Sequence, residues 1–133
     1  MRFGFDFIKV KSYEGVSTTG NVAIKELSNL AEKLKGKDVI VVEDIVDTGT
    51  TLNNLLPKIE SDYGPRCVEV CTLLDKRIGE KKDVSIAYSG FSIPDKFVVG
   101  FGLDYNETFR DLLDIWVLTK EGIEKQGLIA SYS

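Results

Sequence analysis

Three carboxylates stand beside a loop rich in threonine and glycine, in the run VEDIVDTGTTL from Val42 to Leu52. A helix is predicted to begin near Thr50, and the free N–H groups and positive end of such a helix point back at the loop. Gly49 lets a ligand approach the backbone closely. Hydroxyl groups come from Thr48, Thr50 and Thr51. Together these parts make an anion cradle of the size of one phosphate.

The acids Glu43, Asp44 and Asp47 would repel a phosphate unless they had other work. Carboxylates suit ribose hydroxyls and magnesium ions, and one of them can move a proton. The alternative is that Glu43 and Asp44 are solvated loop residues and that Asp47 caps the helix. The spacing matches neither a P-loop nor a dinucleotide-binding glycine motif, and it also misses a calcium loop. The run therefore indicates a site for phosphate and ribose, with the structural alternative open.

A parallel sheet is needed to position this loop. Val39–Val42 is a run of apolar β-branched residues, which is typical of a strand buried on both faces. A helix is predicted from Thr50 to Asp62, with Pro57 expected to kink or shorten it. Val68–Leu74 is the next buried strand. Strand, helix and strand over roughly 35 residues form a βαβ unit with parallel strands, and Glu43–Thr51 lies beyond a strand's C-terminal end, where such sheets bind ligands.

Weaker patterns predict the remaining elements. Apolar residues at helical spacing indicate a helix over Leu27–Leu34, and Glu14–Asn21 reads as a mobile loop. Further strands are predicted at Phe5–Val10, Phe97–Phe101 and Ile115–Leu118. The fold class is α/β, with a mostly parallel central sheet and flanking helices.

The bulk composition narrows the class of protein. A chain of 133 residues fits one domain, and 43% hydrophobic with 29% charged residues is ordinary for a soluble globular protein. The net charge of -4 argues against nucleic acid as a partner, and no run approaches membrane-spanning length. Cys67 and Cys71 lie about 13 Å apart along a strand, too far for a disulfide. They are expected to be small apolar residues on one face of a buried strand, consistent with a cytoplasmic protein.

The run VVEDIVDTGTTL resembles the phosphoribosyl-diphosphate-binding motif of the phosphoribosyltransferases, and an acid at Asp47 resembles their 6-oxopurine branch. Three further segments match the hypoxanthine-guanine phosphoribosyltransferases: DFIKVKSY (Asp6–Tyr13), LLDKR (Leu73–Arg77) and IPDKFVVGFGLDYNETFRDL (Ile93–Leu112). The chain is identified as a member of that family. The resemblance implies a type I phosphoribosyltransferase-like fold and a role in purine salvage. The reaction would transfer the 5-phosphoribosyl group from phosphoribosyl diphosphate to hypoxanthine or guanine, releasing diphosphate.

The resemblance also implies a role for individual residues. Asp47 becomes the catalytic acid/base that faces N7 of the purine, and Arg110 contacts the diphosphate. The phosphoribosyl group is bound by Glu43, Asp44, Thr48, Gly49, Thr50 and Thr51. The Mg²⁺ ion that accompanies the diphosphate is assigned to Glu43, Asp44 and Asp104. A lid loop that closes over the site in this family begins with Lys11, Ser12 and Tyr13.

The purine-binding residues implied by the resemblance are Lys76, Phe97, Val98 and Asp104. Lys76 donates to the exocyclic O6, and an ammonium cannot accept a hydrogen bond from an amine, which favours guanine, hypoxanthine or xanthine over adenine. Phe97 stacks on the base, and the backbone of Val98 reads its edge. Without the family match, Lys76 would be a solvated lysine, Phe97, Val98 and Val99 strand core, and Arg110 part of a surface ion pair.

One departure from the family pattern concerns the N-terminus. Family members carry, before the position of Asp6, a core strand and a short lysine-containing loop that binds diphosphate, whereas Met1 here lies just before Asp6. Residues 1–133 therefore resemble the C-terminal two-thirds of one phosphoribosyltransferase domain, N-terminally incomplete. We expect an enzyme with small-molecule substrates that forms a homodimer or homotetramer. The alternatives are a non-catalytic nucleotide-binding regulator and an inactive fragment.

Overall fold

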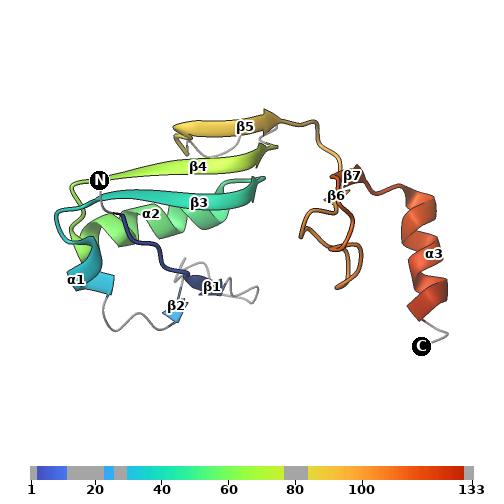
Figure 1. Cartoon of the computed structure of the whole chain (residues 1–133), viewed down its shortest axis with the longest axis horizontal. Helices are drawn as coiled ribbons and strands as arrows, with labels where there is room; N and C mark the ends of the chain where they lie inside the picture. The colour runs from blue at the N-terminus through green and yellow to red at the C-terminus, as the bar shows by residue number, and fades with distance from the viewer. Residues whose placement is uncertain (1–2, 12–22, 26–29, 77–83, 131–133) are drawn as a thin grey trace. The chain divides into compact units, whose positions relative to one another are not determined.

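The computed structural model describes residues 3–11, 23–25, 30–76 and 84–130. Two compact units are present, Met1–Ser92 and Ile93–Ser133, so the single domain stays a prediction. The elements of the first unit are β1 (Lys9–Lys11), β2 (Ala23–Lys25), α1 (Leu30–Leu34), β3 (Asp38–Val46), α2 (Thr50–Tyr63), β4 (Cys67–Asp75) and β5 (Tyr88–Ser92) (Figure 1). Those of the second are β6 (Val98–Val99), β7 (Trp116–Val117) and α3 (Lys120–Ala130).

The first unit is built on a three-stranded parallel sheet in the order β3-β4-β5. Helix α2 connects β3 to β4 and lies along one face of the sheet (Figure 1). Its residues Leu52, Leu55 and Ile59 are buried at three- and four-residue spacing, which places one apolar stripe against the buried Val70 and Leu74 of β4. The predicted βαβ unit and the α/β fold class are confirmed.

The other face of this sheet, which we call the open face, is exposed among the described residues. Successive strand residues point to opposite faces, and Ile40 and Val42 of β3 are 57% and 73% exposed. The expectation of a strand buried on both faces is therefore wrong, because α2 covers only one of them. Cys67, which shares the open face, is exposed and Cys71 is half-buried, so the expected burial of Cys67 is wrong too; both are free thiols.

Four local expectations near the N-terminus and in α2 had mixed outcomes. Of the predicted Phe5–Val10 strand only Lys9 and Val10 pair with β2, in an antiparallel strand β1 that extends to Lys11, and Phe5 and Phe7 are exposed. The predicted helix is confirmed over Leu30–Leu34, while the predicted mobile loop lies outside the described residues. Helix α2 ends one residue later than predicted and continues through Pro57, so this proline does not shorten it. In the described part of the chain, no helix is long and apolar enough to cross a bilayer.

The second unit corrects two strand predictions. The segments around Phe97–Phe101 and Ile115–Leu118 supply only β6 and β7, which form an antiparallel pair of their own rather than joining the parallel sheet. Gly100 follows β6 at a φ of +94°, and a Cβ there would lie 2.1 Å from the carbonyl oxygen of Asp114. A glycine is needed at this close backbone approach. The pattern reading missed β5 and α3.

Candidate active site

Strand β3 is longer than the sequence predicts and carries two of the three acids. Glu43 and Asp44 belong to β3, so the loop between β3 and α2 contains only residues 47–49. The two side chains alternate: Glu43 is half-buried on the face that α2 covers, and Asp44 is exposed on the open face. Burial, with a smaller contribution from the Asp44 charge, raises the pKa of Glu43. The two acids are therefore separated by the sheet.

The start of α2 forms the anion cradle. The N-cap residue is Gly49, at a left-handed φ of 70° and with no side chain to cap the helix, so the alternative that Asp47 is the N-cap residue is wrong. The Thr48 hydroxyl accepts a hydrogen bond from the Thr50 N–H at 3.4 Å and donates one to the Thr50 hydroxyl at 3.0 Å. Thr51 follows in the first turn and is exposed. One short segment thus carries three threonine hydroxyls and the first N–H groups of a helix, and its role as an anion cradle stays a prediction.

Lys76 reaches this loop from the end of the neighbouring strand. Because β3 and β4 are parallel and adjacent, their C-terminal ends meet, and the Lys76 N–H donates to the Val46 carbonyl at 2.9 Å. Its Nζ lies 3.3 Å from Oδ2 of Asp47, and the Lys76 side chain is only 10% exposed. A buried ammonium needs such a partner. The alternative of a solvated lysine is wrong, and a cation and an acid stand side by side next to the cradle.

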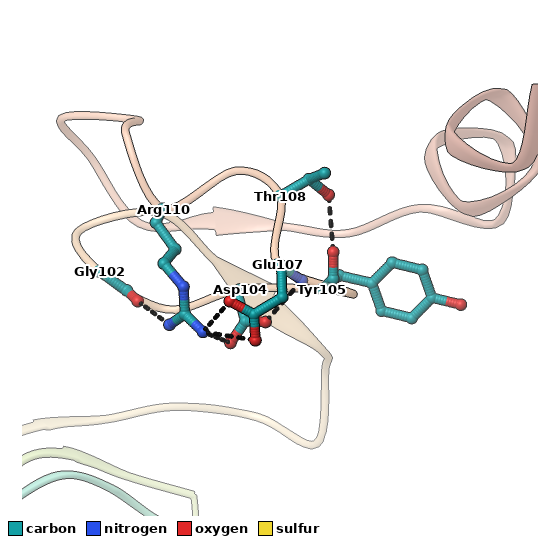
Figure 2. Close-up of polar contacts among 6 residues, drawn as sticks. All are labelled: Gly102, Asp104, Tyr105, Glu107, Thr108 and Arg110. Carbon is teal, nitrogen blue, oxygen red and sulfur yellow. Dashed lines mark hydrogen bonds and ion pairs between the residues drawn. The ribbon is translucent and has the colours of Figure 1, made fainter. Parts of the chain in front are cut away.

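In the second unit, Asp104 and Arg110 lie in one polar network (Figure 2). Arg110 Nη2 lies 3.1 Å from Oδ1 of Asp104 and 3.1 Å from Oε2 of Glu107, and Nη1 donates to the Gly102 carbonyl at 2.8 Å. The Glu107 N–H donates to Oδ2 of Asp104 at 2.9 Å. The Thr108 hydroxyl donates to the Tyr105 carbonyl at 2.6 Å. The surface ion pair weighed for Arg110 is present, and it includes Asp104.

Phe97 exposes part of its aromatic side chain, whereas Val98 directs its backbone polar atoms away from β7. The Phe97 ring is 49% exposed and meets the Tyr105 ring edge to face, with centroids 5.6 Å apart. The Leu118 N–H donates to the Phe97 carbonyl at 2.8 Å. Because hydrogen-bonded and non-hydrogen-bonded pairs alternate in an antiparallel ladder, the polar backbone atoms of Val98 point away from β7. Val99 is buried, which confirms it as core.

Known proteins resemble this chain over most of its length. Residues 2–106 match the phosphoribosyl transferase domain. The chain belongs to that family. It is 46% identical over 114 residues to the hypoxanthine-guanine phosphoribosyltransferase of Mycobacterium avium, covering 86% of this chain and 55% of that protein. It is 44% identical over 120 residues to the Homo sapiens enzyme of the same name, and the match covers 90% of this chain and 54% of that protein. The chain thus spans about half the length of the curated relatives it matches.

Solved structures agree with the fold. A hypoxanthine phosphoribosyltransferase from Staphylococcus aureus superposes with a TM-score of 0.74 at 42% identity, covering 87% of this chain and 62% of that one. The hypoxanthine phosphoribosyltransferase of Trypanosoma cruzi superposes with a TM-score of 0.75 at 37% identity, covering 91% of this chain and 61% of that one. That structure addresses the role of the C-terminal region of the Trypanosoma cruzi enzyme in its oligomeric state and activity. These similarities confirm a type I phosphoribosyltransferase-like fold.

This phosphoribosyl transferase domain brings its expected residues together in two groups. The cradle, Asp47 and Lys76 meet in the first unit, and Phe97, Asp104 and Arg110 lie in the second. Glu43 and Asp44 belong to the first unit and Asp104 to the second, so the metal assignment of these three acids stays a prediction.

The lid assignment is the least described. Lys11 ends β1, and Ser12 and Tyr13 lie outside the described residues. Glu107 was not predicted as a site residue. Its opposite charge, three residues before Arg110, is the sequence signal that indicates an ion pair between them.

Proposed function

We propose that this chain acts in purine salvage, as part of an enzyme that transfers the 5-phosphoribosyl group from phosphoribosyl diphosphate to hypoxanthine or guanine. The products are the nucleoside monophosphate and diphosphate. The observation that carries this proposal is the Lys76–Asp47 pair, 3.3 Å apart at the ends of adjacent parallel strands and next to the cradle of α2. The similarity to hypoxanthine-guanine phosphoribosyltransferases supports it.

The pair matches the chemistry of one purine edge. O6 and N7 are neighbours on a 6-oxopurine, so an ammonium beside a carboxylate can address both at once. Lys76 donates a hydrogen bond to O6, and Asp47 holds the proton that N7 gains or loses as N9 attacks C1 of the ribose. The amino group of adenine offers Lys76 no acceptor, which selects against adenine. In the second unit, the exposed Phe97 ring supplies a stacking surface and Val98 presents backbone groups to the base.

The phosphoribosyl side uses the start of α2. We assign the 5-phosphate to residues 48–51, where the hydroxyls of Thr48 and Thr50 lie within hydrogen-bond distance of each other at the start of α2. Glu43 and Asp44 are assigned to the ribose hydroxyls. Because the pKa of Glu43 is raised, a ribose hydroxyl that donates to its carboxylate stabilises the charged form.

A magnesium ion fits the acids of this chain as a companion of the diphosphate. Mg²⁺ is commonly held by one or two carboxylates together with substrate phosphates. Asp104 supplies one such carboxylate, and Arg110 beside it supplies a cation for the diphosphate. When bound, the ion neutralises charge that develops on the leaving diphosphate.

We also propose a cytoplasmic homodimer or homotetramer. Free thiols at Cys67 and Cys71 support a reducing compartment. The open face, with Ile40 and Val42 exposed, and the outer edge of β3, which pairs with no described strand, support contact with another chain. The lid role of residues 11–13 remains a proposal from the resemblance.

Nucleotide binding tests the proposal independently of turnover. Guanosine monophosphate occupies both the purine position and the cradle, so the chain should bind it. Adenosine monophosphate should bind about tenfold or more weakly, because it cannot make the charge-assisted hydrogen bond to Lys76. Product formation from guanine or hypoxanthine, phosphoribosyl diphosphate and Mg²⁺ is followed by chromatography, with adenine as the control base. Equal affinity for the two nucleotides, or no binding of either, would contradict the proposal.

A further inference from the structure

Arg110 is held by two acids and one carbonyl of its own loop. Nη2 contacts both Asp104 and Glu107 at 3.1 Å, and Nη1 donates to the Gly102 carbonyl at 2.8 Å. Figure 2 shows the guanidinium between the Gly102 carbonyl and the carboxylates of Asp104 and Glu107. Among the described residues the Nε–H donates no hydrogen bond, so this donor remains for an anion.

Glu107 contributes to this network twice. Its backbone N–H donates to Oδ2 of Asp104, while its carboxylate receives Arg110 Nη2 at 3.1 and 3.2 Å. One residue therefore fixes both the acid proposed for the metal and the cation proposed for the diphosphate.

The backbone at Glu107 is strained for its residue type. Its φ is +63°, and Asn106, Phe109 and Phe101 also have positive φ values. Asparagine tolerates this region, whereas glutamate rarely adopts it and glycine would adopt it freely. Strained residues of this kind persist where the surrounding contacts over-determine them, and they cluster at functional sites. The carboxylate that glycine would lack is the group that contacts Arg110.

We propose that Glu107 is a positioning residue that orients the Arg110 guanidinium toward the diphosphate. The inference rests on the proposed function. If Asp104 held a metal ion instead of Arg110, the guanidinium would keep Glu107 and the Gly102 carbonyl as partners. Arg110 then meets the diphosphate without reordering its side chain, which lowers the entropic cost of binding.

Calorimetric titration of the 133-residue chain with inorganic diphosphate and Mg²⁺ tests this. Glu107→Gln removes the charge, and Glu107→Gly also relieves the positive φ. Both variants should raise the dissociation constant about twofold to fivefold, in keeping with one exposed ion pair. Glu124→Gln makes the same charge change at an exposed position of α3 and should bind like the parent.

Stability separates positioning from a purely structural role. Glu107→Gly should melt at an unchanged or higher temperature, and both variants should keep their guanosine monophosphate affinity. The Arg110 Nε–H resonance in ¹⁵N NMR should move in Glu107→Gln without ligand. An unchanged diphosphate affinity in both variants would overturn the inference alone. No diphosphate binding by the parent chain would overturn the proposed diphosphate site and, with it, the inference.

Discussion

Replacing Lys76 by methionine should separate the purine position from the cradle. The change removes the ammonium and keeps an unbranched side chain of similar length in a place that is only 10% exposed. The Asp47 side chain is 47% exposed, so water can solvate its carboxylate after Nζ is lost and the cost to folding should be small. A charge-assisted hydrogen bond to O6 is worth about 1.5–3 kcal/mol, which corresponds to a loss of roughly 10- to 150-fold in affinity.

The assay compares two ligands by calorimetry. Guanosine monophosphate uses both the base position and the cradle and should lose this factor, while ribose 5-phosphate uses the cradle alone and should bind as before. Lys125→Met, at an exposed position of α3, is the matched control. Equal losses for the two ligands would mean that Lys76 supports the fold of the loop rather than the base, and the reasoning would be refuted.

Three further predictions follow from the same structure. Asp47→Asn should lower kcat about 10²- to 10⁴-fold in a preparation with measurable turnover; near-normal turnover at neutral pH would remove Asp47 from this role. Because burial raises the pKa of Glu43 above its usual value of 4.5, the folded state is favoured below that pH and loses stability as pH rises through the higher folded pKa. Glu43→Gln should therefore raise the melting temperature more at pH 8 than at pH 4, and an equal gain would contradict this assignment. The 133-residue chain, which spans about half its curated relatives, should bind ribose 5-phosphate weakly, turn over poorly and self-associate through the open face. A monodisperse monomer by light scattering, with turnover typical of those relatives, would contradict that expectation.

Local patterns predicted the elements around the cradle because their signals are strong and short-range. An apolar β-branched run and a helical stripe place the start of β3 and both ends of α2 to within one residue. The end of β3 was misplaced because Glu43 and Asp44 are poor strand formers. In the structure they extend the ladder because β4 offers partners as far as Asp75.

Features that depend on contacts between distant segments could not be predicted from local sequence patterns. Four apolar residues in a row look the same whether one face of the strand is covered or two, so the exposure of Ile40 and Val42 could not be foreseen. The YSGFS segment of β5 is polar, and edge pairing alone makes it a strand. The contact of Lys76 with Asp47 depends on the register of β3 against β4, and the resemblance supplied the two residues but not their pairing.

The Lys76–Asp47 pair contributes no net charge to the proposed purine position. A 6-oxopurine carries no net charge near neutral pH, so its entry exchanges one set of short polar contacts for another and moves no net charge. The cradle at α2, in contrast, receives an anion whose long-range field is screened by salt. The two halves of a nucleotide therefore meet this site through forces of different range. We therefore expect ionic strength to change the binding of the phosphate, whereas shape and hydrogen bonding determine the binding of the base.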